Sequence, residues 1–211
     1  GLGDVYKRQK YKNNVMAIKL LKQIELEKRT ATPEEQIILA RYVGWGGLAN
    51  AFSSTASGWE NEYQELKSLL TDVEYKAAMN STITAYYTEP DLIRHIYRAL
   101  ERFGFEGGPD RKILDPGMGT GNFYSVLPEQ FQGSKLFGVE LDSITGRIAQ
   151  KLYPNAEIKV AGFETTDRRD FYDLAVGNVP FGNYKVSDKP YDKLGFSIHN
   201  LSLIHISEPT R

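Results

Sequence analysis

Three glycines at alternate positions mark the first segment that could do chemistry, Asp115-Pro-Gly-Met-Gly-Thr-Gly121. Glycine lets the backbone approach a ligand closely and adopt positive φ. The N–H groups of a helix that follows such a loop can bind a carboxylate as readily as a phosphate. Glu140 ends the next apolar stretch, where an acid can accept hydrogen bonds from both hydroxyls of a ribose. The combination favours a nucleotide-like cofactor over a strand-to-helix turn without a ligand.

The identity of this cofactor follows from what the loop lacks. A nicotinamide-binding loop would have glycine at the sixth position from Gly117, where this chain has Asn122, and no phosphate loop ending in Gly-Lys-Ser/Thr is present. Asp115, at the head of the loop, suits a cationic amine better than a pyrophosphate. S-adenosylmethionine carries an amino group, a carboxylate, a ribose and an adenine, and the loop, the helix end and Glu140 can bind the first three.

The elements that must position these residues alternate between strands and helices after Ser81. The spacing predicts a helix over Arg94–Leu100, opened by Thr88-Glu-Pro-Asp91, and a second helix over Ile144–Leu152. Four strands are predicted, over Lys112–Asp115, Leu136–Glu140, Ile158–Val160 and Tyr172–Val176. This alternation predicts an open α/β fold with a mostly parallel sheet and right-handed crossovers. Ligands of such folds bind at the carboxyl ends of the strands.

The preceding region, Lys10–Met79, is predicted to be helical. Apolar residues recur every three or four positions from Ala17 to Ile24, and two capping boxes, Thr32–Glu35 and Thr71–Glu74, begin further helices. We expect the helix that starts at Thr32 to run to Val43 and to end at Gly44. The large aromatic residues of this region are more typical of a core than of a ligand site.

Composition limits the remaining possibilities. The 211 residues carry 26 basic and 27 acidic side chains and no cysteine, which excludes a polycation, a disulfide scaffold and a thiolate zinc site. No apolar run approaches the roughly 20 residues of a membrane span. The histidines have no partner cluster, so no metal is expected. We expect a soluble cytoplasmic protein with no membrane partner.

The two ends of the chain differ in sequence pattern from the rest. Residues 1–9 and 201–211 share no pattern with their neighbours, and they resemble translated sequencing-adapter read-through. Ordinary frayed termini are the alternative. We therefore expect a helical region over residues 10–80 and an α/β core over residues 81–200 that is truncated after its fourth strand.

The motifs together resemble one enzyme family. Ile113–Phe123 resembles motif I of the class I S-adenosylmethionine-dependent methyltransferases, and Gly177-Asn-Val-Pro-Phe181 resembles the Asn-Pro-Pro-Phe/Tyr motif of the N6-adenine DNA methyltransferases. Tyr86-Tyr-Thr-Glu-Pro90 lies upstream, like the motif that contacts the methionine end of the cofactor in that branch. Tyr42–Gly47, Phe137–Asp142 and Gly177–Tyr184 resemble, more narrowly, the methylase part of large methyltransferase-helicase proteins of conjugative elements and phages, some linked to antirestriction. The resemblance covers residues 10–200 and implies a Rossmann-like sheet.

The resemblance also implies roles for individual residues. Glu140 would bind the ribose and Leu141 would pack on the cofactor adenine, while Phe163 and Glu164 stand where the family reads the adenine edge. The residues that would hold the methionine portion are Tyr87, Thr88, Asp115, Pro116, Gly117, Gly119 and Gly121.

In the family, the Asn-Pro-Pro-Phe/Tyr motif carries the catalysis. The side-chain oxygen of Asn178 and the backbone carbonyl of Val179 would accept hydrogen bonds from the adenine amino group, Pro180 would stiffen the turn, and Phe181 would stack on the extruded base. Most relatives have proline in place of Val179, but only a carbonyl is needed there, so we expect little impairment.

The expected function is methyl transfer from S-adenosylmethionine to N6 of adenine in DNA, within a larger mobile-element protein. DNA would be bound largely through regions outside this chain, and a helicase region could be linked. For that reason we expect little or no turnover from the 211 residues alone. The alternatives are methylation of another planar amino group, such as a protein glutamine or an RNA base, and a non-catalytic DNA-binding or antirestriction module.

Overall fold

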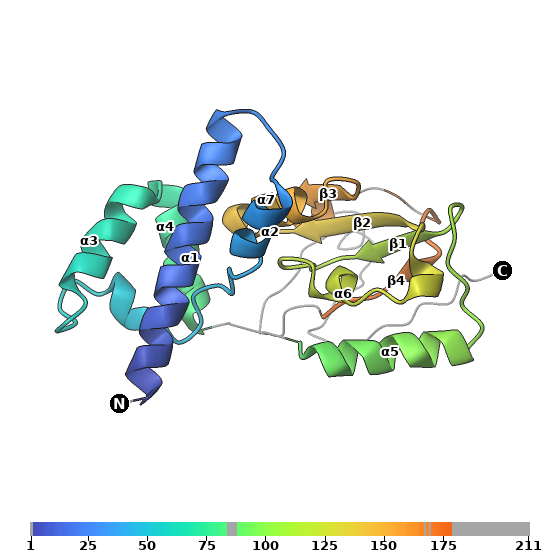
Figure 1. Ribbon diagram of the computed structural model, residues 1–211, viewed down its shortest axis with the longest axis horizontal. Coiled ribbons are helices and arrows are strands. Elements are labelled where there is room, and N and C mark those ends of the chain that lie inside the picture. The colour runs from blue at the N-terminus through green and yellow to red at the C-terminus, as the bar shows by residue number, and fades with distance from the viewer. Residues whose placement is uncertain (1, 84–87, 167, 169, 179–211) are drawn as a thin grey trace, which may run out of the picture. The chain divides into compact units, whose positions relative to one another are not determined.

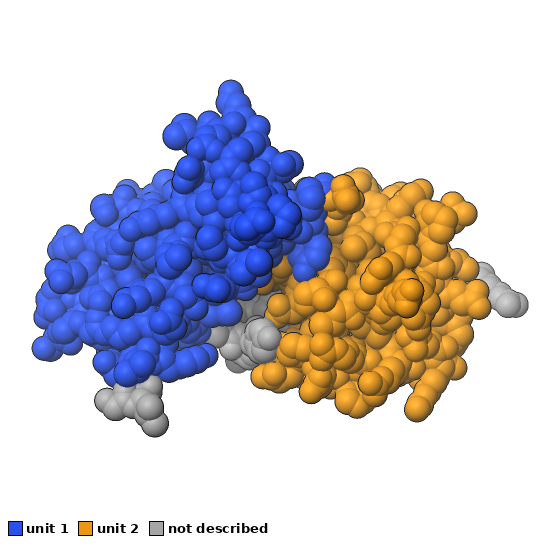
Figure 2. All heavy atoms as spheres, in the orientation of Figure 1, with its two compact units in different colours: residues 1–87, 142–154 blue, residues 88–141, 155–211 orange. Residues whose placement is uncertain are grey.

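The computed structural model describes residues 2–83, 88–166, 168 and 170–178, whose contacts form two compact units (Figure 1, Figure 2). The helical unit comprises residues 1–87 and 142–154, and the sheet unit comprises residues 88–141 and 155–211. We expected an α/β core over residues 81–200. The segment 142–154 instead packs with the N-terminal region, because its buried side chains belong to that region's core.

The helical unit contains α1, α2, α3, α4 and α7 and two short 3-10 turns. Their bounds are α1 Leu2–Leu26, α2 Pro33–Leu39, η1 Ala49–Phe52, α3 Glu60–Leu69, α4 Asp72–Asn80, η2 Ser81–Ile83 and α7 Ser143–Leu152. Both predicted capping boxes are present: Thr32 and Glu35 bond reciprocally at the start of α2, and Thr71 and Glu74 do so at the start of α4.

The helix α2 ends at Leu39, four residues before the predicted end at Val43. The fully buried side chain of Asn14 supplies a reason, because it offers other partners to this backbone. Its amide donates to the carbonyl of Gly44 at 2.7 Å and accepts from the N–H of Val43 at 3.0 Å. A side chain from α1, far away in sequence, thus holds the segment in a non-helical conformation.

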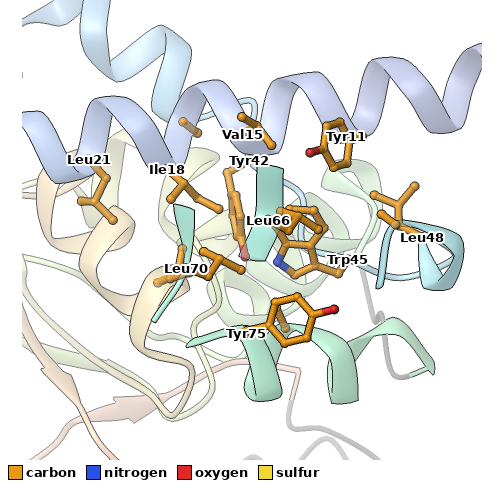
Figure 3. Close-up of a cluster of buried hydrophobic side chains, with 14 of the residues drawn as sticks. Tyr11, Val15, Ile18, Leu21, Tyr42, Trp45, Leu48, Leu66, Leu70 and Tyr75 are labelled. Atoms are coloured by element: carbon orange, nitrogen blue, oxygen red, sulfur yellow. The ribbon is translucent and has the colours of Figure 1, made fainter. Parts of the chain in front are cut away.

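The core of the helical unit combines aliphatic side chains with a group of aromatic ones (Figure 3). Trp45 is 2% exposed and makes edge-to-face contacts with Tyr11, Tyr42 and Phe52. Trp59 is also buried and meets Tyr11 edge on. This confirms that the aromatic residues of the region are core residues.

The helix α7 is part of the same core. Its Ile144 and Ile148 are buried in the aromatic cluster, and its Arg147 binds Glu25 of α1 at 2.7 Å and Glu74 of α4 at 2.8 Å. Lys22 binds the other oxygen of Glu74 at 2.8 Å. In sequence α7 connects two strands of the sheet unit, so the helical unit is completed by a segment from within the α/β region.

The first helix begins at Leu2, whereas we expected helical structure from Lys10. Arg8 takes part in the packing, since it pairs with Glu62 and its guanidinium lies 4.2 Å from the centre of the Trp59 ring. The adapter origin of residues 1–9 stays a prediction, and residues 201–211 lie outside the described residues.

The sheet unit is built on four parallel strands in the order β3-β2-β1-β4, which confirms the predicted α/β fold. The strands are β1 Lys112–Asp115, β2 Lys135–Glu140, β3 Glu157–Val160 and β4 Leu174–Ala175. The other elements are α5 Pro90–Arg102, α6 Asn122–Ser125, η3 Glu129–Phe131 and η4 Phe163–Thr165. The face of α5 that is buried consists of Ile93, Tyr97 and Leu100, and the Tyr97 hydroxyl donates to the carbonyl of Phe123 at 2.9 Å.

The strand order creates a switch point between β1 and β4 (Figure 1). The chain passes from β1 outward to β2 and β3, then returns to the other side of β1 as β4. In open α/β sheets ligands bind outside the carboxyl ends of the strands at such a point. The loops after Asp115 and after Ala175 both begin there.

None of the helices among the described residues has the length and apolar character needed to span a membrane.

Candidate functional site

The glycine-rich loop after β1 is anchored on β2. The N–H of Met118 donates to the carbonyl of Val139 at 3.0 Å, and the buried Met118 side chain lies against Gly138. A Cβ on Gly138 would overlap the sulfur of Met118. Gly119 and Gly121 have φ values of +57° and +94°, a backbone conformation that glycine adopts without strain. The sequence predicted the loop, but not the close contact between Gly138 and Met118.

Asp115 is the buried acid of this site. It is 1% exposed; one carboxylate oxygen accepts from the N–H of Gly117 at 3.2 Å, and the other has no partner among the described residues. Burial, with a smaller contribution from the charge of Glu140, raises the pKa of Asp115 from 3.8 to about 7. Buried polar atoms are nearly always hydrogen-bonded, so an orphan carboxylate oxygen at a strand end fits a cationic donor.

Glu140 closes the loop from the neighbouring strand. Its Oε2 accepts from the N–H of Gly119 at 2.8 Å. This bond fixes the orientation of the carboxylate relative to the glycine loop. The predicted ribose acid and the predicted glycine loop are therefore in contact.

Asn178 joins the cluster from the loop after β4. Its Nδ2 donates to the hydroxyl of Thr88 at 3.0 Å. The preceding residue, Gly177, lies so close to β1 that a Cβ would overlap Oδ1 of Asp115 and would come within 3.2 Å of Pro116. Sequence reasoning did not assign a role to Gly177, although its position directly before Asn178 was a signal.

The structure thus brings together a predicted cofactor acid and a predicted catalytic amide. Glu140 contacts the glycine loop at Gly119, and Asp115 at the head of this loop packs against Gly177. The next residue, Asn178, bonds to Thr88, so the whole cluster lies at the carboxyl ends of the strands. Thr88 and Asn178 are 90 positions apart in sequence, so their contact depends on the strand order.

Other predicted residues are not joined to this cluster by the contacts seen. Leu141 is 75% exposed and Phe163 is 51% exposed. The carboxylate of Glu164 folds back over Gly162, where an added Cβ would overlap it. Their cofactor contacts stay predictions. Tyr87, Val179, Pro180 and Phe181 lie outside the described residues.

The expected anion site at the start of the helix after the glycine loop stays a prediction. The helix after the glycine loop, α6, is only one turn long, so it has little aligned dipole with which to bind an anion. The Gly117 and Gly119 N–H groups moreover donate to Asp115 and Glu140. The Thr88 hydroxyl, which has a proton of its own to give, adds a donor to the cluster.

Comparison with known proteins adds relatives. No protein-family model matches the chain. It is 29% identical over 195 residues, 90% of its length, to the "Defense against restriction protein B" of Escherichia phage P1. It is 31% identical over 96 residues, 46% of its length, to the type II methyltransferase M.CvrRI of Paramecium bursaria Chlorella virus XZ-6E. The chain spans 7% and 24% of the lengths of these two relatives.

Comparison with solved structures gives matches at low identity and low TM-score. The methyltransferase subunit of a type I restriction-modification system from Streptococcus thermophilus is 18% identical with a TM-score of 0.42, and the match covers 72% of this chain and 40% of that one.

The parallel sheet, its strand order and the loop after β1 define the Rossmann-like fold of the class I methyltransferases, preceded by a helical region. The predicted resemblance to this family and to antirestriction proteins is confirmed, since a phage antirestriction protein and a type II methyltransferase are among the relatives.

Proposed function

We propose that this chain is the catalytic part of an S-adenosylmethionine-dependent methyltransferase that acts on the N6 amino group of adenine in DNA. The observation that carries the proposal is the contact of the two loops at the switch point. Gly177 packs on Asp115, and Asn178 bonds to Thr88 at 3.0 Å. An acid suited to the cofactor and an amide suited to the substrate therefore lie together at the carboxyl ends of the strands.

The residues present fit the cofactor. The orphan oxygen of Asp115 suits the amino group of the methionine end, and the electrostatic cost of its burial falls when a cation is bound. Glu140, held by Gly119, suits the ribose hydroxyls. Thr88 would donate to the carboxylate. When bound, S-adenosylmethionine supplies an electrophilic methyl group on a sulfonium.

Asn178 prepares the nucleophile. The amino nitrogen of adenine is a poor nucleophile because its lone pair is delocalised into the ring. An oxygen acceptor aimed at an amino hydrogen draws the nitrogen toward a tetrahedral form, which needs positioning rather than a strong base. Because Nδ2 of Asn178 is held by Thr88, Oδ1 is the atom left for this work. The carbonyl of Val179 and the ring of Phe181 keep the roles that the resemblance implies.

DNA as substrate is supported by the relatives, which include a type II methyltransferase and a defence protein against restriction. A linked helicase region and a cytoplasmic location are extensions of the same proposal. A planar amino group in RNA or in a protein glutamine could use the same acceptors, so the test must offer all three substrates.

The test has a binding step and a transfer step. Calorimetry on the 211-residue chain should show S-adenosylmethionine binding that Asp115→Asn weakens. The complete gene product that carries this chain is then given labelled S-adenosylmethionine with DNA, RNA and a glutamine-bearing release-factor-like protein. N6-methyladenine in DNA, detected by mass spectrometry and lost in Asn178→Ala, is the expected result. Label in RNA or protein alone would overturn the choice of substrate, and undetectable cofactor binding would favour the non-catalytic module.

A further inference from the structure

The contact between Thr88 and Asn178 carries an inference that rests on the proposed function and deepens it. We propose that Thr88 is a positioning residue whose hydroxyl decides which atom of the Asn178 amide faces the substrate. The hydroxyl does so by accepting a hydrogen bond from Nδ2 while it gives its own proton to the carboxylate of the cofactor. Binding of the cofactor would thereby determine that the Asn178 amide presents an acceptor, and not a donor, to the substrate.

The argument begins with the amide. A rotation of 180° about χ2 exchanges the carbonyl oxygen of an asparagine with its NH₂ group. Only the oxygen can accept a hydrogen bond from the amino group of a base. The NH₂ group of the asparagine is itself a donor and cannot form this bond. In the structure Nδ2 points to the Thr88 hydroxyl at 3.0 Å, so Oδ1 lies on the other branch of the amide. The observed rotamer is the productive one.

The hydroxyl by itself does not enforce this rotamer. A threonine hydroxyl has one proton and two lone pairs, so it could equally donate to Oδ1 and leave Nδ2 outward. The choice is removed when an anion takes the single proton, because the hydroxyl can then only accept. The carboxylate of S-adenosylmethionine is on the same carbon as the amino group assigned to Asp115, and Asp115 is joined to Thr88 through Gly177 and Asn178.

Thr88 is also close in sequence to a helix with a buried face. It lies two residues before α5, whose first residue is Pro90, with φ fixed by its ring. The α5 residues Ile93 and Tyr97 are fully buried. A side chain that orients another group needs such a rigid support.

The first experiment uses the 211-residue chain and a readout independent of turnover. The side-chain NH₂ signals of Asn178 are identified in a ¹⁵N spectrum by their loss in Asn178→Ala. Addition of S-adenosylhomocysteine, which has the same carboxylate but no methyl group to transfer, should shift these signals and slow their exchange. Thr88→Ser, which keeps the hydroxyl, should behave like the wild type, whereas Thr88→Val should lose the slowing at saturating ligand. Equal slowing in Thr88→Val would overturn the proposal.

The second experiment separates positioning from simple cofactor binding in the complete gene product. At saturating S-adenosylmethionine, kcat of Thr88→Val should stay about tenfold below wild type, because a misdirected acceptor is not repaired by more cofactor. Thr88→Ser should recover most of kcat. A Thr88→Val enzyme with raised KM and wild-type kcat would make Thr88 a cofactor contact only. Failure of the proposed function has a different signature, since the wild type would then methylate no adenine at all. Equal melting temperatures of the two Thr88 variants control for folding.

Discussion

The two units each contain a buried acid, and the two acids behave in opposite ways. Glu74 of the helical unit has an 8% exposed side chain that binds Lys22 and Arg147 at 2.8 Å each and accepts from the N–H of Thr71 at 2.9 Å. Asp115 of the sheet unit receives one bond from Gly117 and keeps an oxygen with no partner among the described residues.

The pKa values reflect this difference in partners. Burial opposes ionisation of Glu74, but hydrogen bonds from Lys22, Arg147 and the Thr71 backbone outweigh it and lower the pKa from 4.5 to about 2. The pKa of Asp115 rises to about 7, because burial is not offset. A buried acid whose partners come from its own fold stabilises that fold, whereas an acid left short of partners is available for a ligand.

The largest effect is expected from Asp115→Asn. It removes the negative charge at nearly constant volume, and a charge-assisted hydrogen bond to an ammonium group is worth about 1.5–3 kcal/mol, so affinity for S-adenosylmethionine should fall roughly 10- to 100-fold. Unfolding free energy at pH 8 should stay equal or rise, since an under-partnered buried charge is removed. Calorimetry and urea titration measure the two quantities. Unchanged affinity would show that Asp115 is structural.

Glu74→Gln is the matched control and should show the reverse pattern. It takes the charge from the network of Lys22 and Arg147, which should lower the unfolding free energy of the helical unit by about 2 kcal/mol, somewhat below the value for a fully buried pair. Both tryptophans, Trp45 and Trp59, belong to this unit, so fluorescence follows its unfolding selectively. Cofactor affinity should be unchanged. A loss of affinity as large as that of Asp115→Asn would break the division between a structural and a functional acid.

The pH dependence of stability sharpens the contrast further. The folded pKa of Asp115 is raised, so the folded state binds more protons between pH 4 and 7 and this acid lowers stability as pH rises through that window. The folded pKa of Glu74 is depressed, so its stabilisation is present above about pH 4.5 and is lost as pH falls toward 2. Unfolding free energies are measured from pH 2 to 8. In Asp115→Asn the decline in stability between pH 4 and 7 should disappear, and in Glu74→Gln the rise in stability between pH 2 and about 4.5 should disappear. Identical profiles for wild type and both variants would contradict the assignment.

Local signals in the sequence predicted much of this architecture. The capping boxes at Thr32 and Thr71 and the strand Lys112–Asp115 were predicted correctly, because each depends on residues within one turn or one strand. The glycine loop and Glu140 were also placed correctly at the carboxyl ends of β1 and β2.

Features that depend on distant contacts were missed. The spacing of Ile144 and Ile148 predicts a helix, but it does not show that this helix packs into the same core as α1. The early end of α2 depends on Asn14, and the close packing at Gly138 depends on Met118. The periodicity of a segment records which face is buried, but it does not record what covers that face.

The smallest expected effect compares the two capping boxes within the helical unit. Thr32→Ala removes a side chain that accepts from the N–H of Glu35 in an exposed capping box, and should lower the unfolding free energy by about 0.5–1 kcal/mol.

Thr71→Ala removes the equivalent acceptor, which bonds to the N–H of Glu74 at 3.2 Å. Glu74 binds two cations, Lys22 and Arg147, with an 8% exposed side chain, whereas Glu35 of the first box binds only Arg29 among the pairs seen in the described residues and is 19% exposed. Loosening the first turn of α4 therefore disturbs the network as well, and the loss should approach 2 kcal/mol. The difference between the two losses should vanish in a Glu74→Gln background, because the network is then already weakened. A difference that persists there would mean that cap and network are independent.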